Sequence, residues 1–124
     1  METKILLIDD SALIQQMYRM VLSRYKCHLV TANNGQDGLD KLSRNTDVGL
    51  ILVDINMPVM NGLEFIKKVN EGGTFRHIPI VIVSTEGKEE DTQKGIALGA
   101  KAYLKKPFQP SALHALIEKL CPVP

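Results

Sequence analysis

The stretch that decides the fold class is residues 48–54, Val-Gly-Leu-Ile-Leu-Val-Asp. It is too short for a helix, and it is apolar at consecutive positions and not at alternate ones. A strand of this composition is typically buried on both faces, as in parallel sheets that carry helices on either side. Because Asp54 follows the apolar run directly, this buried strand is predicted to end on a charged group.

Four further short apolar runs lie on either side of this stretch, at residues 5–8, 29–32, 80–83 and 102–104. The run at 80–83 reads Ile-Val-Ile-Val and, like 48–53, is predicted to be buried on both faces. The run at 29–32 is the weaker one, and the run at 102–104 is short. Together they predict five strands.

Longer amphipathic stretches between the runs are predicted to be helices. They begin after the capping residue Ser11, at residue 36, after the capping residue Asn61, at residue 89 and at Pro110. The stripe predicted to face inward on the first helix contains Leu13, Ile14, Met17, Met20 and Val21. Strands that alternate with helices pair in parallel. The predicted fold is therefore a single doubly wound α/β domain with helices on both faces of the sheet.

Composition and charge limit the function classes. The chain has 124 residues, of which 44% are hydrophobic and 23% charged, and its formal net charge is +1. This balance argues against a disordered chain, and it gives no sign of direct binding to nucleic acid or of association with a membrane. The expected organisation is one domain over residues 1–120, with 121–124 as a tail or truncated linker. No export signal is recognised, so the expected compartment is the cytoplasm.

Polar side chains follow the predicted strands where ligands bind in folds of this kind. They are Asp9 and Asp10, Asp54, Ser84 and Lys106. Carboxylate oxygens are ligands that Mg²⁺ prefers, and an aspartate can attack phosphorus to give an acyl phosphate. A lysine and a serine hydroxyl can bind phosphoryl oxygens. The residues alone therefore suggest a Mg²⁺-dependent phosphoaspartate site.

The same residues carry a family resemblance over nearly the whole chain, from Lys4 to about Leu120. The paired aspartates, Asp54-Ile-Asn-Met-Pro with Gly62, Ser84 after Ile-Val-Ile-Val, and Lys106-Pro-Phe occur in the expected order. The chain resembles the receiver domain of two-component response regulators, and in particular chemotaxis regulators. The resemblance implies a flavodoxin-like five-stranded sheet in the order 2-1-3-4-5.

The resemblance also implies roles for the charged residues. Asp54 is expected to be the phosphoacceptor and Lys106 to pair with the phosphoryl group. Asp10 is expected to bind Mg²⁺ directly and Asp9 to orient metal-bound water. Asn56 would add its backbone carbonyl to the metal.

Other residues are expected to switch or modulate the site. Ser84 and Tyr103 resemble the pair that shifts on phosphorylation, which changes the face made by the fourth helix, fifth strand and fifth helix. Asn56, Thr85 and Glu86 are expected to modulate the lifetime of the phosphorylated form. The family usually has Ala or Gly where Thr85 stands, so this chain is predicted to react more slowly with small phosphodonors than a Thr85→Ala variant.

Structural alternatives stay open for each residue. Asp9 and Asp10 can cap the first helix, and Asp54 can begin a turn. Ser84 can act as a cap residue, Lys106 can be a solvated surface charge, and Tyr103 can fill a half-buried strand position.

The predicted function is that of a phosphoacceptor switch in a phosphorelay. The expected partners are a sensor histidine kinase or phosphotransfer protein and a downstream protein or output domain. The chain itself is expected to be a monomer or weak dimer and not a turnover enzyme. One alternative is a haloacid-dehalogenase-like phosphatase, which needs a second Asp where this chain has Asn56. Another is a pseudo-receiver that binds partners without phosphorylation.

Overall fold

The sheet confirms the predicted topology. The computed structural model describes residues 3–55, 60–85, 89–106 and 108–121, and its strands are all parallel in the order β2-β1-β3-β4-β5. The strands are β1 (Thr3–Ile8), β2 (Cys27–Ala32), β3 (Val48–Asp54), β4 (Ile80–Thr85) and β5 (Ala102–Lys106). Each contains the apolar run that predicted it and extends that run by one or two residues at one end.

Helices connect the strands. They are α1 (Ala12–Val21), the short 3₁₀ turn η1 (Leu22–Arg24), α2 (Gly35–Arg44), α3 (Gly62–Gly72), α4 (Glu89–Ala97) and α5 (Pro110–Leu120). The caps explain several of these bounds. The side chains of Ser11 and Asn61 accept hydrogen bonds from the backbone N–H groups of Ile14 and Glu64. Gly73, with φ of 78°, ends α3 in a conformation that favours glycine.

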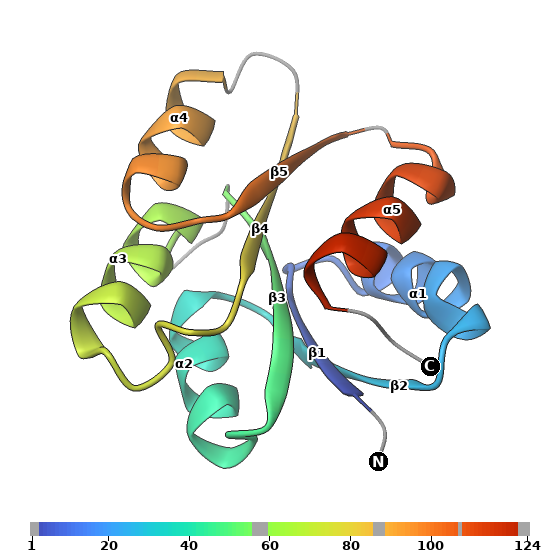
Figure 1. The fold of residues 1–124 in the computed structure, drawn as a ribbon, viewed down its shortest axis with the longest axis horizontal. Coiled ribbons are helices and arrows are strands. Elements are labelled where there is room, and N and C mark those ends of the chain that lie inside the picture. Colours follow the sequence, from blue (N-terminus) through green and yellow to red (C-terminus); the bar gives the residue numbers. More distant parts are fainter. Residues whose placement is uncertain (1–2, 56–59, 86–88, 107, 122–124) are drawn as a thin grey trace.

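The molecule has three layers, with α1 and α5 on one side of the sheet and α2, α3 and α4 on the other (Figure 1). Alternation along each strand divides the core in two. Leu50, Leu52, Val81 and Val83 pack against α1 and α5, whereas Ile51, Val53, Ile80 and Ile82 belong to the opposite cluster. Both central strands are thus buried on two faces, as their composition predicted.

The apolar stripe predicted for α1 is wrong in part. Leu13 is 79% exposed and Met20 is 70% exposed, and Met17 also lies at the surface. The residue buried against the sheet is Tyr18, with Leu22 one turn later. The exposed and the buried residues both recur at helical spacing. Packing of α1 on the sheet buries the side of the helix that carries the aromatic ring of Tyr18.

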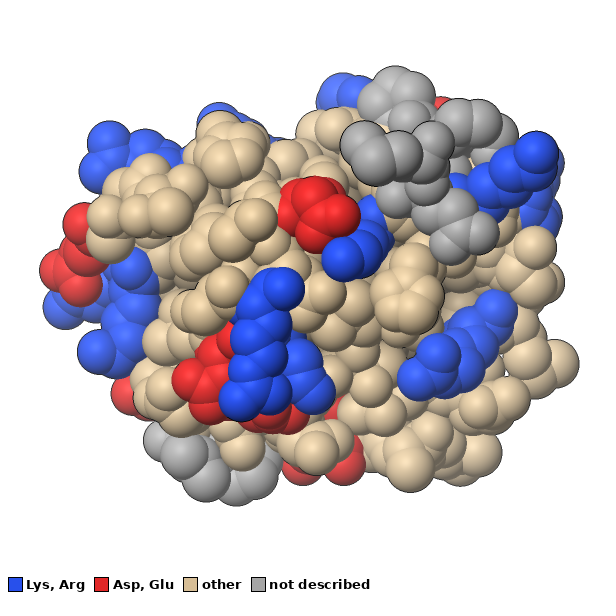
Figure 2. Space-filling view, turned by 90° about the horizontal axis from the view of Figure 1, so that it is seen from below, with Lys and Arg blue, Asp and Glu red and all other residues tan. Residues whose placement is uncertain are grey.

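The surface agrees with the near-neutral composition. On the face shown in Figure 2, Lys and Arg side chains are interspersed with Asp and Glu side chains and with broad uncharged areas. Among the described residues, no helix combines the length and apolar character that crossing a bilayer requires.

Candidate functional site

The carboxyl end of β1 delivers two aspartates to the edge of the sheet. Ile8 pairs with Val53 on β3, so the residues that follow each strand emerge side by side. Asp9 is buried, and its Oδ1 accepts a hydrogen bond of 2.9 Å from the backbone N–H of Ser11. The N–H of Asp9 donates in turn to the carbonyl of Ala32 on β2. Asp9 is therefore held rigidly where β1 ends and α1 begins.

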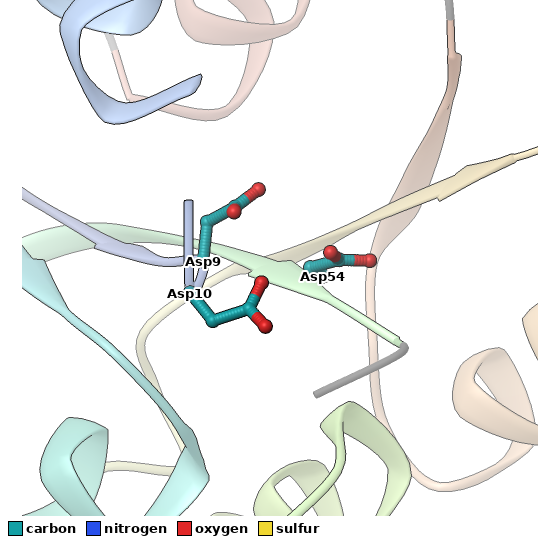
Figure 3. Close-up of side chains that lie close together, drawn as sticks. All are labelled: Asp9, Asp10 and Asp54. Atoms are coloured by element: carbon teal, nitrogen blue, oxygen red, sulfur yellow. The ribbon is translucent and has the colours of Figure 1, made fainter. Parts of the chain in front are cut away.

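Asp54 at the end of β3 completes a cluster of three carboxylates (Figure 3). One oxygen from each of Asp9, Asp10 and Asp54 lies within 4.8 Å of the other two. Asp9 is buried, Asp54 is half-buried and Asp10 is exposed, so the cluster opens to solvent on the Asp10 side. Like charges at this separation repel, and partial burial weakens the screening by water. Such an arrangement is costly unless a cation balances it.

Lys106 at the end of β5 supplies one positive charge to this cluster. Its Nζ lies 3.4 Å from Asp9 Oδ2 and 3.6 Å from Asp54 Oδ2. The pairing of Lys106 with Thr85 on β4 fixes its backbone at the same edge of the sheet. Among the described residues, the contacts of Lys106 set one ammonium group against three carboxylates, which leaves an excess of negative charge.

The donor set suits a Mg²⁺ ion. All three side chains offer hard carboxylate oxygens, and the exposed side of the cluster would leave room for the waters and phosphoryl oxygens that Mg²⁺ retains. The predicted backbone ligand, the carbonyl of Asn56, lies outside the described residues, as does the predicted modulator Glu86. The side chain of Thr85 is not described either. The predictions for these residues stay predictions.

Ser84 and Tyr103, the predicted switch residues, border a small cavity on the α4 side of the sheet. The cavity has a volume of about 150 Å³ and is lined by Ser84, Glu89, Thr92, Gln93, Tyr103 and Lys105. Tyr103 is 57% exposed on β5, whereas Ser84 is only 4% exposed. The Ser84 hydroxyl accepts a hydrogen bond of 3.1 Å from the Thr92 hydroxyl on α4. The two switch residues thus line one cavity, but in different environments.

Two residues near the site escaped sequence reasoning. Tyr18 is fully buried, and its hydroxyl has no hydrogen-bond partner among the described residues. Burial, and then the negative charges of Asp9 and Asp54, raise the pKa of Tyr18 well above its usual value. The centroid of its ring lies 5.7 Å from that of Phe108, which stands two residues after Lys106 in the sequence. The available signal was the four-residue spacing of Tyr18 and Leu22 from Ile14, which the predicted stripe already contained.

Thr92 is the second residue that was missed. It is 6% exposed and occupies the side of α4 that faces the sheet, together with Gly95. The sequence offered little indication, because a threonine among the charged residues of a helix usually faces solvent. The larger apolar side chain of Ile96 on the same helix is 40% exposed.

Comparison with known proteins places this arrangement in a family. The model of the response regulator receiver domain matches residues 5–118. Chemotaxis protein CheY1 of Helicobacter pylori is 34% identical over 116 residues, which cover 93% of this chain and 94% of that protein. The transcriptional regulatory protein ResD of Bacillus subtilis is 36% identical over 96% of this chain, but the match covers only 48% of ResD.

Solved structures agree with these relatives. Chemotaxis protein CheY4 of Vibrio cholerae is 35% identical, and it superposes with a TM-score of 0.87 over 97% of this chain and 99% of that one. A receiver domain protein from Clostridium thermocellum has the same TM-score at 24% identity, which supports the fold alone. The predicted family and strand order are confirmed.

Proposed function

The chain belongs to the response regulator receiver domain family, and on that basis we propose that Asp54 accepts a phosphoryl group from the phosphohistidine of a sensor histidine kinase or phosphotransfer protein. The observation that carries the proposal is the convergence of Asp9, Asp10, Asp54 and Lys106 at one edge of the sheet. These residues come from three strand ends that lie far apart in the sequence. A charge cluster of this composition suits phosphoryl transfer, which depends mainly on positioning and on charge stabilisation.

In the proposed reaction an oxygen of the Asp54 carboxylate attacks phosphorus. The new O–P bond forms as the N–P bond of the phosphohistidine breaks, and the imidazole leaves with the electron pair of that bond. Lys106, 3.6 Å from Asp54, would move with the charge from the carboxylate to the new phosphoryl oxygens. The Lys106 ammonium group also contacts the Asp9 carboxylate, which the backbone N–H of Ser11 holds in place.

Mg²⁺ would be held by the side chains of Asp10 and Asp54 and by the carbonyl of Asn56. Asp9 would orient metal-bound water. A bound divalent cation supplies the positive charge that offsets the repulsion between carboxylate and phosphoryl oxygens.

Phosphorylation would then shift the equilibrium between two packings of the switch region. A phosphoryl group can bias that equilibrium only through contacts that differ between the two states. Ser84 would donate to a phosphoryl oxygen, and Tyr103, now 57% exposed, would turn inward toward the cavity that both residues line. The face formed by α4, β5 and α5 would change and so regulate a partner or output domain.

We place this switch in the cytoplasm, as a monomer or weak dimer without direct contact to nucleic acid or membrane. Residues 1–120 form the receiver unit in this proposal, and 121–124 a tail or linker. The chain would accept and later lose its phosphoryl group and would not turn over a separate substrate.

Two alternative functions are less well supported. A haloacid-dehalogenase-like phosphatase requires its nucleophile after the first strand and a second aspartate two residues later. In this chain Asp54 ends β3, and Asn56 stands two residues later. A pseudo-receiver would have no need to keep three carboxylates and a lysine in contact.

Intact mass after incubation with acetyl phosphate tests the proposal. With Mg²⁺ the protein should gain the mass of one phosphoryl group, and chelation of the cation should abolish the gain. Asp54→Asn should show none, whereas Asp40→Asn on the exposed surface of α2 should behave like the wild type. An equal gain in Asp54→Asn would contradict the proposal.

A further inference from the structure

A hydrogen bond between two buried hydroxyls connects the end of β4 to α4. The hydroxyl of Thr92 donates to that of Ser84 over 3.1 Å. The exposed fractions of Ser84 and Thr92 are 4% and 6%, and among the described residues the other buried polar side chain is that of Asp9. In this bond the buried Thr92 hydroxyl has an acceptor for its proton, and the Ser84 oxygen has a donor. If Ser84 turned away from α4, the Thr92 hydroxyl would lose this acceptor.

Strand alternation fixes the side of the sheet on which this pair lies. Val83 packs with the α1 and α5 cluster, and Ile82 packs with the opposite one. Ser84 therefore falls on the same side of β4 as Ile82. On α4, Gly95 approaches Ile82 so closely that a Cβ on the glycine would collide with it. Thr92 and Gly95 together hold α4 against this part of the sheet.

Asp54 is in register with Val83, the neighbour of Ser84 in β4. A phosphoryl group on Asp54 would thus lie beside the end of β4, and the Ser84 side chain would have to turn away from α4 to approach it. Because Ser84 accepts from Thr92 and keeps its own proton, its recruitment to a phosphoryl oxygen requires a change of side-chain rotamer and not the release of that proton. In the present arrangement the Ser84 hydroxyl is instead held on the α4 side of the sheet, beside the cavity that Tyr103 borders.

We propose that Thr92 is a positioning residue whose hydroxyl holds Ser84 on α4 and competes with the phosphoryl group for it. The inference rests on the proposed function of Asp54. The Thr92 contact stabilises the unphosphorylated packing, and a phosphoryl group must displace it to recruit Ser84. Thr92 thereby lowers the affinity of the site for a phosphoryl group.

Loss of the Thr92 hydroxyl changes the two states unequally. In the unphosphorylated state it leaves the buried Ser84 hydroxyl without this partner, which raises the free energy of that state. In the phosphorylated state Ser84 has the phosphoryl oxygen instead. Because the variant loses one hydrogen bond in the unphosphorylated state only, its affinity for a phosphoryl group should rise roughly three- to tenfold.

The test measures binding of beryllofluoride, a non-covalent phosphoryl analogue, to the full chain in the presence of Mg²⁺. Thr92→Val, which keeps the shape of the side chain, should lower the Kd about three- to tenfold. Thr92→Ser, which keeps the hydroxyl, should match the wild type. In a Ser84→Ala background, Thr92→Val should have no further effect, because the competing partner has already been removed.

The outcomes separate this inference from the function beneath it. An unchanged or raised Kd in Thr92→Val would refute the competition. An equal effect of Thr92→Val with and without Ser84 would also refute it, since Thr92 would then act through the packing of α4. If the wild type does not bind beryllofluoride, or if Asp54→Asn binds it equally well, the proposed function itself fails and the inference with it.

Discussion

Replacement of Asp54 by asparagine is expected to stabilise the protein when no divalent cation is present. Asparagine has nearly the same size and shape as aspartate but carries no charge. The substitution therefore removes one of three carboxylates whose oxygens lie within 4.8 Å of one another, with little change in packing. It also removes the attraction between Asp54 and Lys106, which lie 3.6 Å apart. The sign of the effect depends on which contribution is larger.

The distances decide the sign. At an effective dielectric constant of about 20, repulsion at 4.8 Å amounts to roughly 3.5 kcal/mol for each of the pairs with Asp9 and Asp10. The attraction to Lys106 at 3.6 Å amounts to roughly 4.6 kcal/mol on the same scale. The two repulsions together exceed the attraction by about 2 kcal/mol. Asp10 is exposed, so screening by water reduces the expected gain to about 1 kcal/mol.

Thermal unfolding in the presence of a chelator measures this gain. A stabilisation of this size should raise the Tm of Asp54→Asn by about 3–5 °C in a domain of this length. Asp40→Asn, which removes an exposed charge on α2, should leave the Tm almost unchanged. Added Mg²⁺ should raise the Tm of the wild type, because the ion binds the folded cluster, and should raise that of Asp54→Asn less.

A lower Tm for Asp54→Asn in the chelated protein would refute the reasoning. It would mean that the contact with Lys106 outweighs both repulsions and that the cluster is a stable ion-pair network, not a site that lacks positive charge. A rise of equal size in Asp40→Asn would also refute it, because the effect would then reflect the overall charge of the protein.

Three further substitutions test other parts of the account. Tyr18→Phe removes a buried hydroxyl that has no partner among the described residues. Urea unfolding should therefore show a free energy of unfolding that is unchanged or raised by up to about 1 kcal/mol. A clear loss of stability would contradict this, because it would reveal a contact of that hydroxyl. Gly95→Ala places a Cβ against Ile82 and should destabilise by about 1–3 kcal/mol in the same assay, whereas Gly72→Ala, where a Cβ meets nothing within 4 Å, should be neutral or slightly stabilising. Lys106→Gln removes a cation that contacts Asp9 and Asp54, so a Mg²⁺ titration should show tighter binding, and weaker binding would contradict the charge excess assigned to the cluster.

The strands and their order along the chain could be predicted because their sequences allow few alternatives. Residues 48–53 and 80–83 are too apolar for a surface and too short for most helices, and the structure buries both. The meeting of Asp9, Asp54 and Lys106 follows from the same logic, since parallel strands end at a common edge. The order of the strands in the sheet could be predicted only from the family resemblance, because the short connections by themselves allow several arrangements.

The orientation of α1 could not be predicted from its own sequence. The predicted stripe joined Ile14 and Val21, which pack against the core, to three residues that lie at the surface, Leu13, Met17 and Met20. A helix considered alone gives no reason to separate the two groups. The choice depends on the shape of the sheet surface, where the cluster of Leu7, Leu52 and Val83 accepts the Tyr18 ring. Packing of this kind depends on residues distant in the sequence.

The contact between Thr92 and Ser84 was also beyond prediction. Its two residues belong to successive elements, and whether they meet depends on how closely α4 approaches β4. That approach depends on Gly95, whose lack of a side chain lets the helix lie against Ile82. A glycine in the interior of a helix is unfavourable by itself, so its presence was an indication of close packing that the sequence did contain.

The central claim is that Asp54 carries the phosphoryl group, and peptide mapping tests it most directly. Borohydride reduces an aspartyl phosphate to homoserine, which mass spectrometry locates in the sequence. After incubation with acetyl phosphate and Mg²⁺, the account predicts homoserine at position 54 and its loss when the cation is chelated. Homoserine at another aspartate, or unmodified Asp54 in protein that has gained a phosphoryl group, would contradict the account.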